Sequence, residues 1–202
     1  MSDGSDARRV PAGEGRGDVR EKASRFLGLV RRTGSAEEAE DFVAGVRREH
    51  HDATHVAFAY RVGGGDAAVV RSADAGEPSG TAGRPILAAI ESAGMTDAAV
   101  AVVRHFGGTK LGTGGLARAY RLAAERALAA AGAEIVYETV RIEVHCPHAR
   151  TGTVRRLLDP PGVRLTDERF DPEPILALEI RRSRVGEIEA ALTEARLSFR
   201  RL

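Results

Sequence analysis

Residues 104–120 read Arg-His-Phe-Gly-Gly-Thr-Lys-Leu-Gly-Thr-Gly-Gly-Leu-Ala-Arg-Ala-Tyr and form the most distinctive stretch of this 202-residue chain. Five glycines fall within residues 107–115. That composition suits neither a helix nor a strand, because glycine loses more backbone freedom on ordering than any other residue. The pattern that follows predicts a long helix over residues 116–131, closed by Gly132. We therefore expect a glycine-rich loop that opens directly into a helix.

This predicted loop has the features of an anion site. A helix that begins at its end presents unpaired N–H groups and the positive end of the helix dipole. Three basic residues accompany it, Arg104, Lys110 and Arg118. Phosphate groups bind at helix starts of this kind. The alternative is a packing loop, in which the glycines let the helix meet a strand and the charges are solvated. The sequence leaves both interpretations open.

Two nucleotide-binding motifs do not fit this loop. A P-loop requires Gly-x-x-x-x-Gly-Lys-Ser/Thr, and Thr113 stands where the lysine must be. Gly112-x-Gly114-x-x-Ala117 matches a dinucleotide-binding fingerprint in isolation. However, the preceding predicted strand, residues 98–103, ends too early for the tight turn that this fingerprint requires.

A second polar loop, residues 72–83, leads into a predicted helix that begins near Arg84 and ends near residue 93. Its polar side chains include two candidate helix caps, Ser79 and Thr81, and two acids, Asp74 and Glu77. The acids would bind a cation or repel phosphate. If both loops lie at the same edge of one sheet, they form a single polar cleft, a point that the sequence does not decide.

The remaining segments predict an α+β protein. Ser35 and Glu38 form a capping box for a helix that ends near His50. We expect strands over residues 24–30, 54–62, 67–71 and 98–103. From about residue 139 the order becomes β-α-β-β-α-β, the ferredoxin-like pattern, with elements over residues 139–145, 150–158, 163–170, 175–181, 185–195 and the last residues. The expected divisions are a disordered leader (1–18), a first domain (19–138) and a ferredoxin-like second domain (139–202).

Composition narrows the classes of function. Thirty basic residues face twenty-nine acidic ones, a balance that argues against a general nucleic-acid-binding surface and leaves a local patch open. One cysteine makes neither an internal disulfide nor a zinc cluster. No apolar run reaches the roughly 18–20 residues that span a membrane. We expect a cytoplasmic protein with no membrane partner.

Two further groups of side chains contain residue types that metal sites and nucleophilic sites use. His51 and His55 have the i,i+4 spacing of a helical metal pair, but residues 52–54 resemble a helix exit, so we expect no metal site. Cys146 lies between His145 and His148. A thiol near histidine is weak evidence for a nucleophile without a third group that orients the base.

The two loops together resemble the signature of the YigZ/IMPACT family. The resemblance rests on Ser-Ala-Asp-Ala-Gly-Glu-Pro-Ser-Gly-Thr-Ala-Gly-Arg-Pro-Ile at residues 72–86 and on residues 104–120. Residues 22–26 and 52–55 are similar to two further family segments. His105 is a departure, because the family usually has tyrosine or another aromatic residue there. An imidazole can stack, but it also titrates near neutral pH, which leaves the behaviour of the cleft open.

The resemblance implies a fold and a role. The first domain would be like a small-subunit ribosomal protein domain and elongation factor G domain IV, and the second like elongation factor G domain V. It implies binding linked to translation, no cofactor and no established catalytic residue. The family resemblance and the two loops together predict a ligand surface. Its residues are His55, Asp74, Glu77, Ser79, Gly80, Thr81, Arg84, Arg104, Phe106, Gly107, Gly108, Lys110, Gly112, Gly114, Gly115 and Arg118.

Two classes of function follow from these observations. The first is a regulatory protein that binds RNA, the ribosome or a translation-related protein through an anion-binding cleft. The second is an enzyme, a small-metabolite kinase or phosphate hydrolase, in which Asp74 or Glu77 would hold magnesium. A pure protein–protein adaptor is a third possibility. The sequence identifies neither the ligand nor the oligomeric state.

Overall fold

The structure is a computed structural model that describes residues 6–157, 161–170 and 172–202. The chain divides between Ile135 and Val136 into two units. The first unit is residues 8–135, and the second is residues 136–202 together with the described residues Asp6 and Ala7. A two-stranded ribbon pairs β1 (Ala7–Pro11) with β7 (Ala133–Tyr137).

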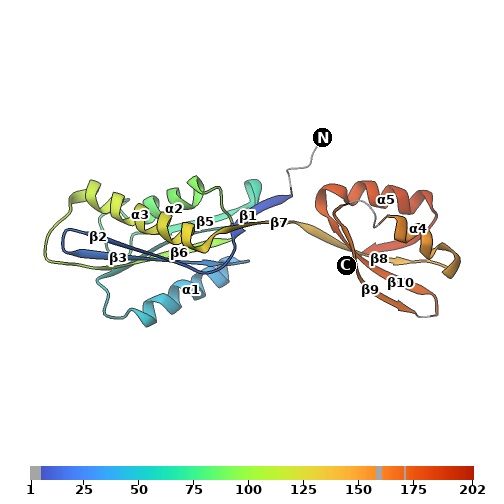
Figure 1. Cartoon of the computed structure of the whole chain (residues 1–202), viewed down its shortest axis with the longest axis horizontal. Coiled ribbons are helices and arrows are strands. Elements are labelled where there is room, and N and C mark those ends of the chain that lie inside the picture. Colours follow the sequence, from blue (N-terminus) through green and yellow to red (C-terminus); the bar gives the residue numbers. More distant parts are fainter. Residues whose placement is uncertain (1–5, 158–160, 171) are drawn as a thin grey trace. The chain divides into compact units, whose positions relative to one another are not determined.

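An antiparallel five-stranded sheet forms the centre of the first unit, in the order β2-β3-β6-β4-β5. Its strands are β2 (Gly15–Glu21), β3 (Ser24–Arg32), β4 (His55–Val62), β5 (Val69–Ala73) and β6 (Ala98–His105). Helix α1 (Ala36–Glu49) covers one face, and α2 (Gly83–Ser92) and α3 (Gly112–Ala131) cover the other (Figure 1).

Alternation along the central strands separates two cores. On β4, Ala57 and Ala59 pack under α2 and α3, whereas Val56, Phe58 and Tyr60 pack under α1. The continuous apolar run of β6 serves both cores and is buried throughout residues 98–103. This explains why that run has no polar face: a strand covered on both sides needs none.

The amino-terminal segment differs from the prediction. The expectation of a disordered leader is wrong for residues 7–11 and 15–18, which lie in β1 and β2; residues 1–5 lie outside the described residues. Val10 and Val19 are buried. Gly15 and Gly17 face α3 so closely that a Cβ atom on either would lie 2.2 or 2.5 Å from a helix carbonyl oxygen. Amino-acid composition alone does not distinguish glycines that pack against a helix from glycines of a disordered segment.

Three boundaries also shift. Helix α3 begins at Gly112, not at residue 116, so Gly112, Gly114 and Gly115 lie in its first turn. Gly112 enters the helix with a φ of +72°, a conformation that glycine adopts without a steric penalty. A single 3-10 turn occupies residues 65–67, which moves the following strand to residues 69–73. Helix α4 is shorter than expected, at Thr151–Arg156, and residue 158 lies outside the described residues.

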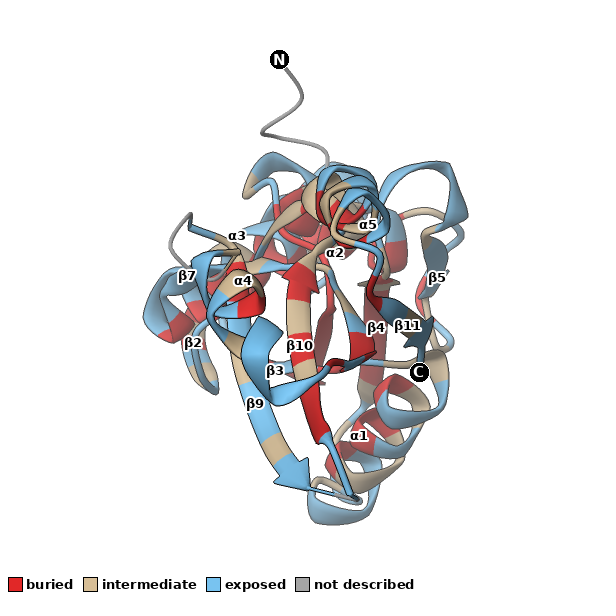
Figure 2. Cartoon of the chain, turned by 90° about the vertical axis from the view of Figure 1, so that its right-hand side faces the viewer, coloured by how far each residue is buried: buried red, intermediate tan, exposed pale blue. Residues whose placement is uncertain are grey.

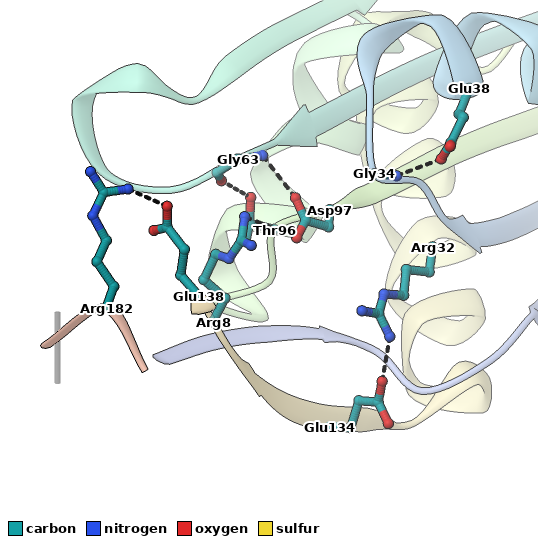
Figure 3. A network of polar contacts seen from close by, with 10 residues as sticks. All are labelled: Arg8, Arg32, Gly34, Glu38, Gly63, Thr96, Asp97, Glu134, Glu138 and Arg182. Atoms are coloured by element: carbon teal, nitrogen blue, oxygen red, sulfur yellow. Dashed lines mark hydrogen bonds and ion pairs between the residues drawn. The ribbon is translucent and has the colours of Figure 1, made fainter. Parts of the chain in front are cut away.

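The β4–β5 hairpin is tied to the start of β6 by a polar network (Figure 3). The buried carboxylate of Asp97 accepts a hydrogen bond from the Gly63 backbone N–H at 2.8 Å and forms an ion pair with Arg8 at 3.3 Å. The hydroxyl of Thr96 donates to the Gly63 carbonyl. The backbone N–H and the carbonyl of Gly63 are therefore both hydrogen-bonded. These bonds hold β4 in register with β6.

The second unit has the predicted β-α-β-β-α-β order. Its elements are β8 (Thr139–His145), α4, β9 (Val163–Phe170), β10 (Pro174–Arg181), α5 (Val185–Glu194) and β11 (Ser198–Arg201). The strands form an antiparallel sheet in the order β11-β8-β10-β9, with α4 and α5 on one side (Figure 1). Buried and partly exposed residues alternate along β10 from Leu176 to Arg181 (Figure 2), since one face packs on the helices.

Helices in the part of the chain that the structure describes are all too short or too polar to cross a membrane.

Candidate functional site

The two loops meet at one edge of the first sheet. Arg104, at the end of β6, pairs in register with His55 at the start of β4. A cavity of about 440 Å³ opens between the loops, and we refer to it as the loop pocket. Residues from both loops and from the start of β4 line it: Thr54, His55, Glu77, Pro78, Arg104, Phe106, Lys110, Leu111, Gly112, Thr113 and Leu116.

A buried polar triad lies at the base of the loop pocket. Arg104 Nη1 donates to Glu77 Oε1 at 2.5 Å, and the Tyr120 hydroxyl donates to the same oxygen at 2.7 Å. The Arg104 and Glu77 side chains are 6% and 3% exposed. Burial, together with the Glu77 carboxylate, raises the pKa of Tyr120 well above its usual range. The charge of Arg104 is therefore compensated within the protein.

Aromatic rings flank the buried guanidinium. Arg104 lies 5.4 Å from the centre of the Phe26 ring and 5.3 Å from that of Phe106, distances typical of cation–π contacts. Phe106 is 44% exposed. Its backbone N–H donates to the Thr54 hydroxyl at 3.0 Å. The outer face of a large apolar ring is thus held at the edge of the loop pocket.

The start of α2 is capped by a side chain of the polar loop at residues 72–83. Asp74 Oδ1 accepts hydrogen bonds from the backbone N–H groups of Ala82 and Gly83, at 2.9 and 2.8 Å, and Oδ2 accepts one from Gly80 at 2.8 Å. Ser79 and Thr81 were candidate caps, and neither caps the helix: the N-cap position is Ala82, and Thr81 donates to the Pro78 carbonyl. The anion at this helix start is the protein's own carboxylate.

Hydrogen bonding fixes the charge of Asp74. Partial burial raises the pKa of this carboxyl, but the N–H groups of Gly80, Gly83 and Ala82 outweigh it and the net pKa is lowered. A carboxylate with a lowered pKa contributes stability above the unfolded-state pKa of about 3.9, and that contribution is lost as pH falls through the folded-state value.

Asp74→Ala is expected to lower the free energy of unfolding by about 2 kcal/mol near pH 7, because three backbone donors lose their acceptor. The difference between the variant and the wild type should shrink as pH falls below about 4. Urea unfolding from pH 7 to pH 3 measures both quantities. A difference independent of pH would contradict a role for the ionised carboxylate.

The start of α3 is arranged differently. Among the described residues, no side chain caps it with a hydrogen bond. Gly112, Thr113 and Gly114 are exposed, and so are Lys110 and Arg118. The helix therefore offers free N–H groups, the positive end of its dipole and two cationic side chains.

The glycines of the glycine-rich loop, residues 107–115, are required for different structural reasons. Gly107 lies against residue 23, where a Cβ atom would come within 2.0 Å of the Ala23 carbonyl oxygen. Gly108 has a φ of +84°. Gly115 is buried against Leu111, whereas Gly114 is exposed. Some of these glycines therefore pack, as the packing-loop interpretation predicts, and others leave the helix start accessible. Anion binding at this helix start stays a prediction.

The structure brings six of the predicted site residues to the loop pocket: His55, Glu77, Arg104, Phe106, Lys110 and Gly112. Arg84 and Ser79 are exposed outside its lining. Sequence reasoning missed Tyr120, which completes the triad. The signal was available in its four-residue spacing from Leu116, which places both side chains on the inward face of one helix.

The histidine and cysteine groups do not form a catalytic arrangement. Helix α1 ends at Glu49, so His51 and His55 share no helical face, as predicted. His55 Nδ1 lies 2.9 Å from the Ala75 carbonyl oxygen. Among residues 6–157, 161–170 and 172–202, no group of three or more metal-ligating side chains is gathered. Cys146 is fully buried, and burial raises the pKa of its thiol, which disfavours the nucleophilic thiolate.

Comparison with known proteins places these loops in a family. The model of the Impact N-terminal domain matches residues 22–128, which includes both loops and the triad. The chain belongs to the IMPACT family. An IMPACT family member of Haemophilus influenzae is 33% identical over 86% of this chain and 84% of its own length. YigZ of Escherichia coli, also an IMPACT family member, is 31% identical over 86% and 85%.

The likeness extends over both units of the IMPACT-family chain. A crystal structure of a hypothetical protein matches with a TM-score of 0.70 at 30% sequence identity, and covers 98% of this chain and 97% of the other. The predicted family is therefore confirmed, and so is an α+β fold that continues beyond the first unit.

Proposed function

We propose that this IMPACT-family chain is a translation-associated regulatory protein that binds single-stranded RNA at the loop pocket. The observation that carries the proposal is the exposed ring of Phe106 beside an uncapped, cationic helix start. Single-strand binders combine those two features, because bases stack on aromatic side chains while basic groups contact the backbone. The family resemblance supplies the link to translation.

Electrostatics favour the α3 side of the loop pocket for a phosphate group. Asp74 already fills the start of α2, so a second anion there would meet a carboxylate. The start of α3 carries Lys110 and Arg118 and no acidic residue in its first turn. Glu77 does not oppose this, since its charge is compensated by Arg104. A phosphate at Gly112–Gly114 would leave the adjoining base near Phe106.

Charge reversal at the helix start tests this proposal. Lys110→Glu/Arg118→Glu is expected to weaken binding of a single-stranded RNA, and co-sedimentation with ribosomes, at least tenfold, because two phosphate contacts become repulsive. The salt dependence of the affinity should also become shallower. Fluorescence anisotropy between 50 and 200 mM salt measures both effects.

Arg47→Glu/Arg48→Glu is the matched control. It reverses the same number of charges at exposed positions of α1, on the opposite face of the same sheet. The control should retain near-wild-type affinity. Equal loss in both variants would show that only net charge matters, and the absence of RNA binding by the wild type would remove RNA from the proposal.

Stacking on Phe106 is tested separately within the same experiment. Phe106→Leu keeps an apolar side chain but removes the aromatic face, and base–aromatic stacking contributes about 1–3 kcal/mol per base. Binding unchanged in this variant, with binding lost in the charge reversal, would restrict the pocket to phosphate contacts.

The geometry does not favour the alternative of a magnesium-dependent kinase or hydrolase. Asp74, one of its two candidate ligands, has both oxygens engaged by backbone N–H groups. Glu77, the other candidate, is held by Arg104 and Tyr120.

We also propose that the two units resemble domains IV and V of elongation factor G. The antiparallel sheet order and one-sided helices of the second unit support the likeness to elongation factor G domain V. A cytoplasmic location, and a first unit like domain IV of that factor, follow from the family resemblance.

A further inference from the structure

One face of the four-stranded sheet in the second unit carries an excess of positive charge. Helices α4 and α5 cover the other face, where Ile142, Leu178 and Ile180 form part of the core. Strand register places the alternate residues together on the side away from the helices, which we call the open face. A register shift in β9, between the partners of Ala177 and Leu178, brings Arg164 to the same face as Arg169. Five arginines lie on it, from all four strands: Arg141, Arg164, Arg169, Arg181 and Arg200.

Three acidic residues share the open face, and two of them hold the arginines in place. Glu143, buried at the centre, pairs with Arg169 and with Arg200 at 2.7 Å, and accepts a contact from His145 at 2.9 Å. Glu179 pairs with Arg164 at 2.5 Å. Asp167 is the third acid and lies opposite Ala177.

The arginines remain available to a partner despite these pairs. The side chains of Arg164, Arg169 and Arg200 are 75%, 55% and 64% exposed. Arg141 is also exposed. One buried carboxylate that anchors two exposed guanidinium groups leaves net positive charge at the surface. A guanidinium also has five donors, so a single ion pair leaves some of them free for phosphate.

The surface lacks the features of a protein-binding patch. Interfaces between proteins have an apolar core that is rich in aromatic residues. Among the described residues of these strands, the exposed phenylalanine ring is that of Phe170, which belongs to the helix-side register and stacks on His148. Tyr137 lies under Arg181, 3.4 Å from its guanidinium carbon to the ring centre. Ile175, an apolar residue that the register places on the open face, is buried. The described part of the open face is therefore basic and offers no large exposed hydrophobic side chain on its four strands.

We infer that the open face binds the phosphate backbone of double-stranded RNA. A duplex presents no unstacked base, so its recognition does not require an exposed aromatic platform. Proteins read the major groove of B-form DNA by inserting a helix or a two-stranded ribbon. Within the described residues of this unit, α4 and α5 pack on the opposite side of the sheet. The wide, shallow minor groove of A-form RNA is instead recognised through shape and through contacts to the backbone, and exposed arginines on a sheet face offer such contacts. This surface is separate from the loop pocket, and the inference does not depend on it.

The test uses the full chain carrying Lys110→Glu/Arg118→Glu, which removes the cationic side chains at the loop pocket. Duplex binding by the open face can then be interpreted even if the single-strand proposal fails. In that background, Arg141→Gln/Arg164→Gln removes two exposed charges and keeps the buried Glu143 cluster. Binding of a 16-base-pair RNA duplex, measured by anisotropy, should weaken about tenfold, and the slope of log affinity against log salt should fall by about two.

Arg155→Gln/Arg156→Gln is the matched control, because it removes two arginines from α4 on the covered side of the same unit. Its duplex affinity should match that of the background protein. Several results would overturn the inference: no duplex binding, equal weakening in the control, equal affinity for B-form DNA, or equal displacement by polyglutamate of matched charge. Circular dichroism confirms that each variant is folded.

Discussion

Glu77→Ala is expected to lower the free energy of unfolding by about 3–5 kcal/mol, because it leaves a buried guanidinium without its counter-ion. Arg104 is 6% exposed at its side chain, and within the described chain its Nε atom already has no hydrogen-bond partner. The Tyr120 hydroxyl loses its acceptor in the same substitution. Urea denaturation followed by circular dichroism measures the loss.

A triple substitution separates the cost of an unpaired charge from the cost of lost volume. Glu77→Leu/Arg104→Met/Tyr120→Phe replaces the whole triad with apolar groups of similar size, and such replacements of buried ion pairs are often close to neutral. The triple variant should therefore be more stable than Glu77→Ala. If it were equally unstable, shape at the base of the loop pocket, and not charge, would set the stability of this region.

Gly28→Ala is expected to destabilise the first unit by about 3 kcal/mol through overpacking. A Cβ atom at this position of β3 would lie 2.3 Å from the Ala123 carbonyl oxygen and 2.7 Å from its carbon, both in the backbone of α3. The contact is with a helix backbone and not with a side chain that can rotate away. Helix α3 must therefore shift from the sheet, and it carries the start that borders the loop pocket.

Gly45→Ala is the control for that substitution. Gly45 lies within α1, where the nearest atom to an added Cβ is 3.9 Å away on the Arg48 side chain. Alanine has the higher helix propensity by about 1 kcal/mol, so this variant should be slightly more stable than the wild type. Thermal unfolding of both variants is sufficient. A Gly28→Ala protein as stable as the wild type would show that α3 can adjust at little cost.

Local chemistry explains which elements were predictable. Ser35 accepts the Glu38 backbone N–H at 3.1 Å, as the capping-box spacing predicts. The returning carboxylate of Glu38 accepts from Gly34, one residue earlier than in the standard box. Gly132 closes α3 with a φ of +68°. In each case the interacting groups lie within a few residues, so spacing along the chain reports the contact.

The cap of α2 shows where such reasoning failed. Ser79 and Thr81 are polar residues close to the helix start, but the N-cap position itself is Ala82. Asp74 supplies the acceptor from nine residues before Gly83. The loop folds back on itself to achieve this, and Gly80 takes a φ of +75° within it. A charged acceptor that reaches three donors gains more than a hydroxyl that reaches one.

The sequence by itself determined the family, the α+β class and the β-α-β-β-α-β order of the second unit, because periodicity and motif spacing are local properties. Tertiary structure alone decided that Glu77, Arg104 and Tyr120 form one buried triad across separations of 27 and 43 residues. It also decided that Gly15 and Gly17 pack against α3, where composition predicts disorder. The physical reason is burial: removal from water turns polar side chains into obligatory partners and small ones into contacts, and burial is set by what the rest of the chain covers.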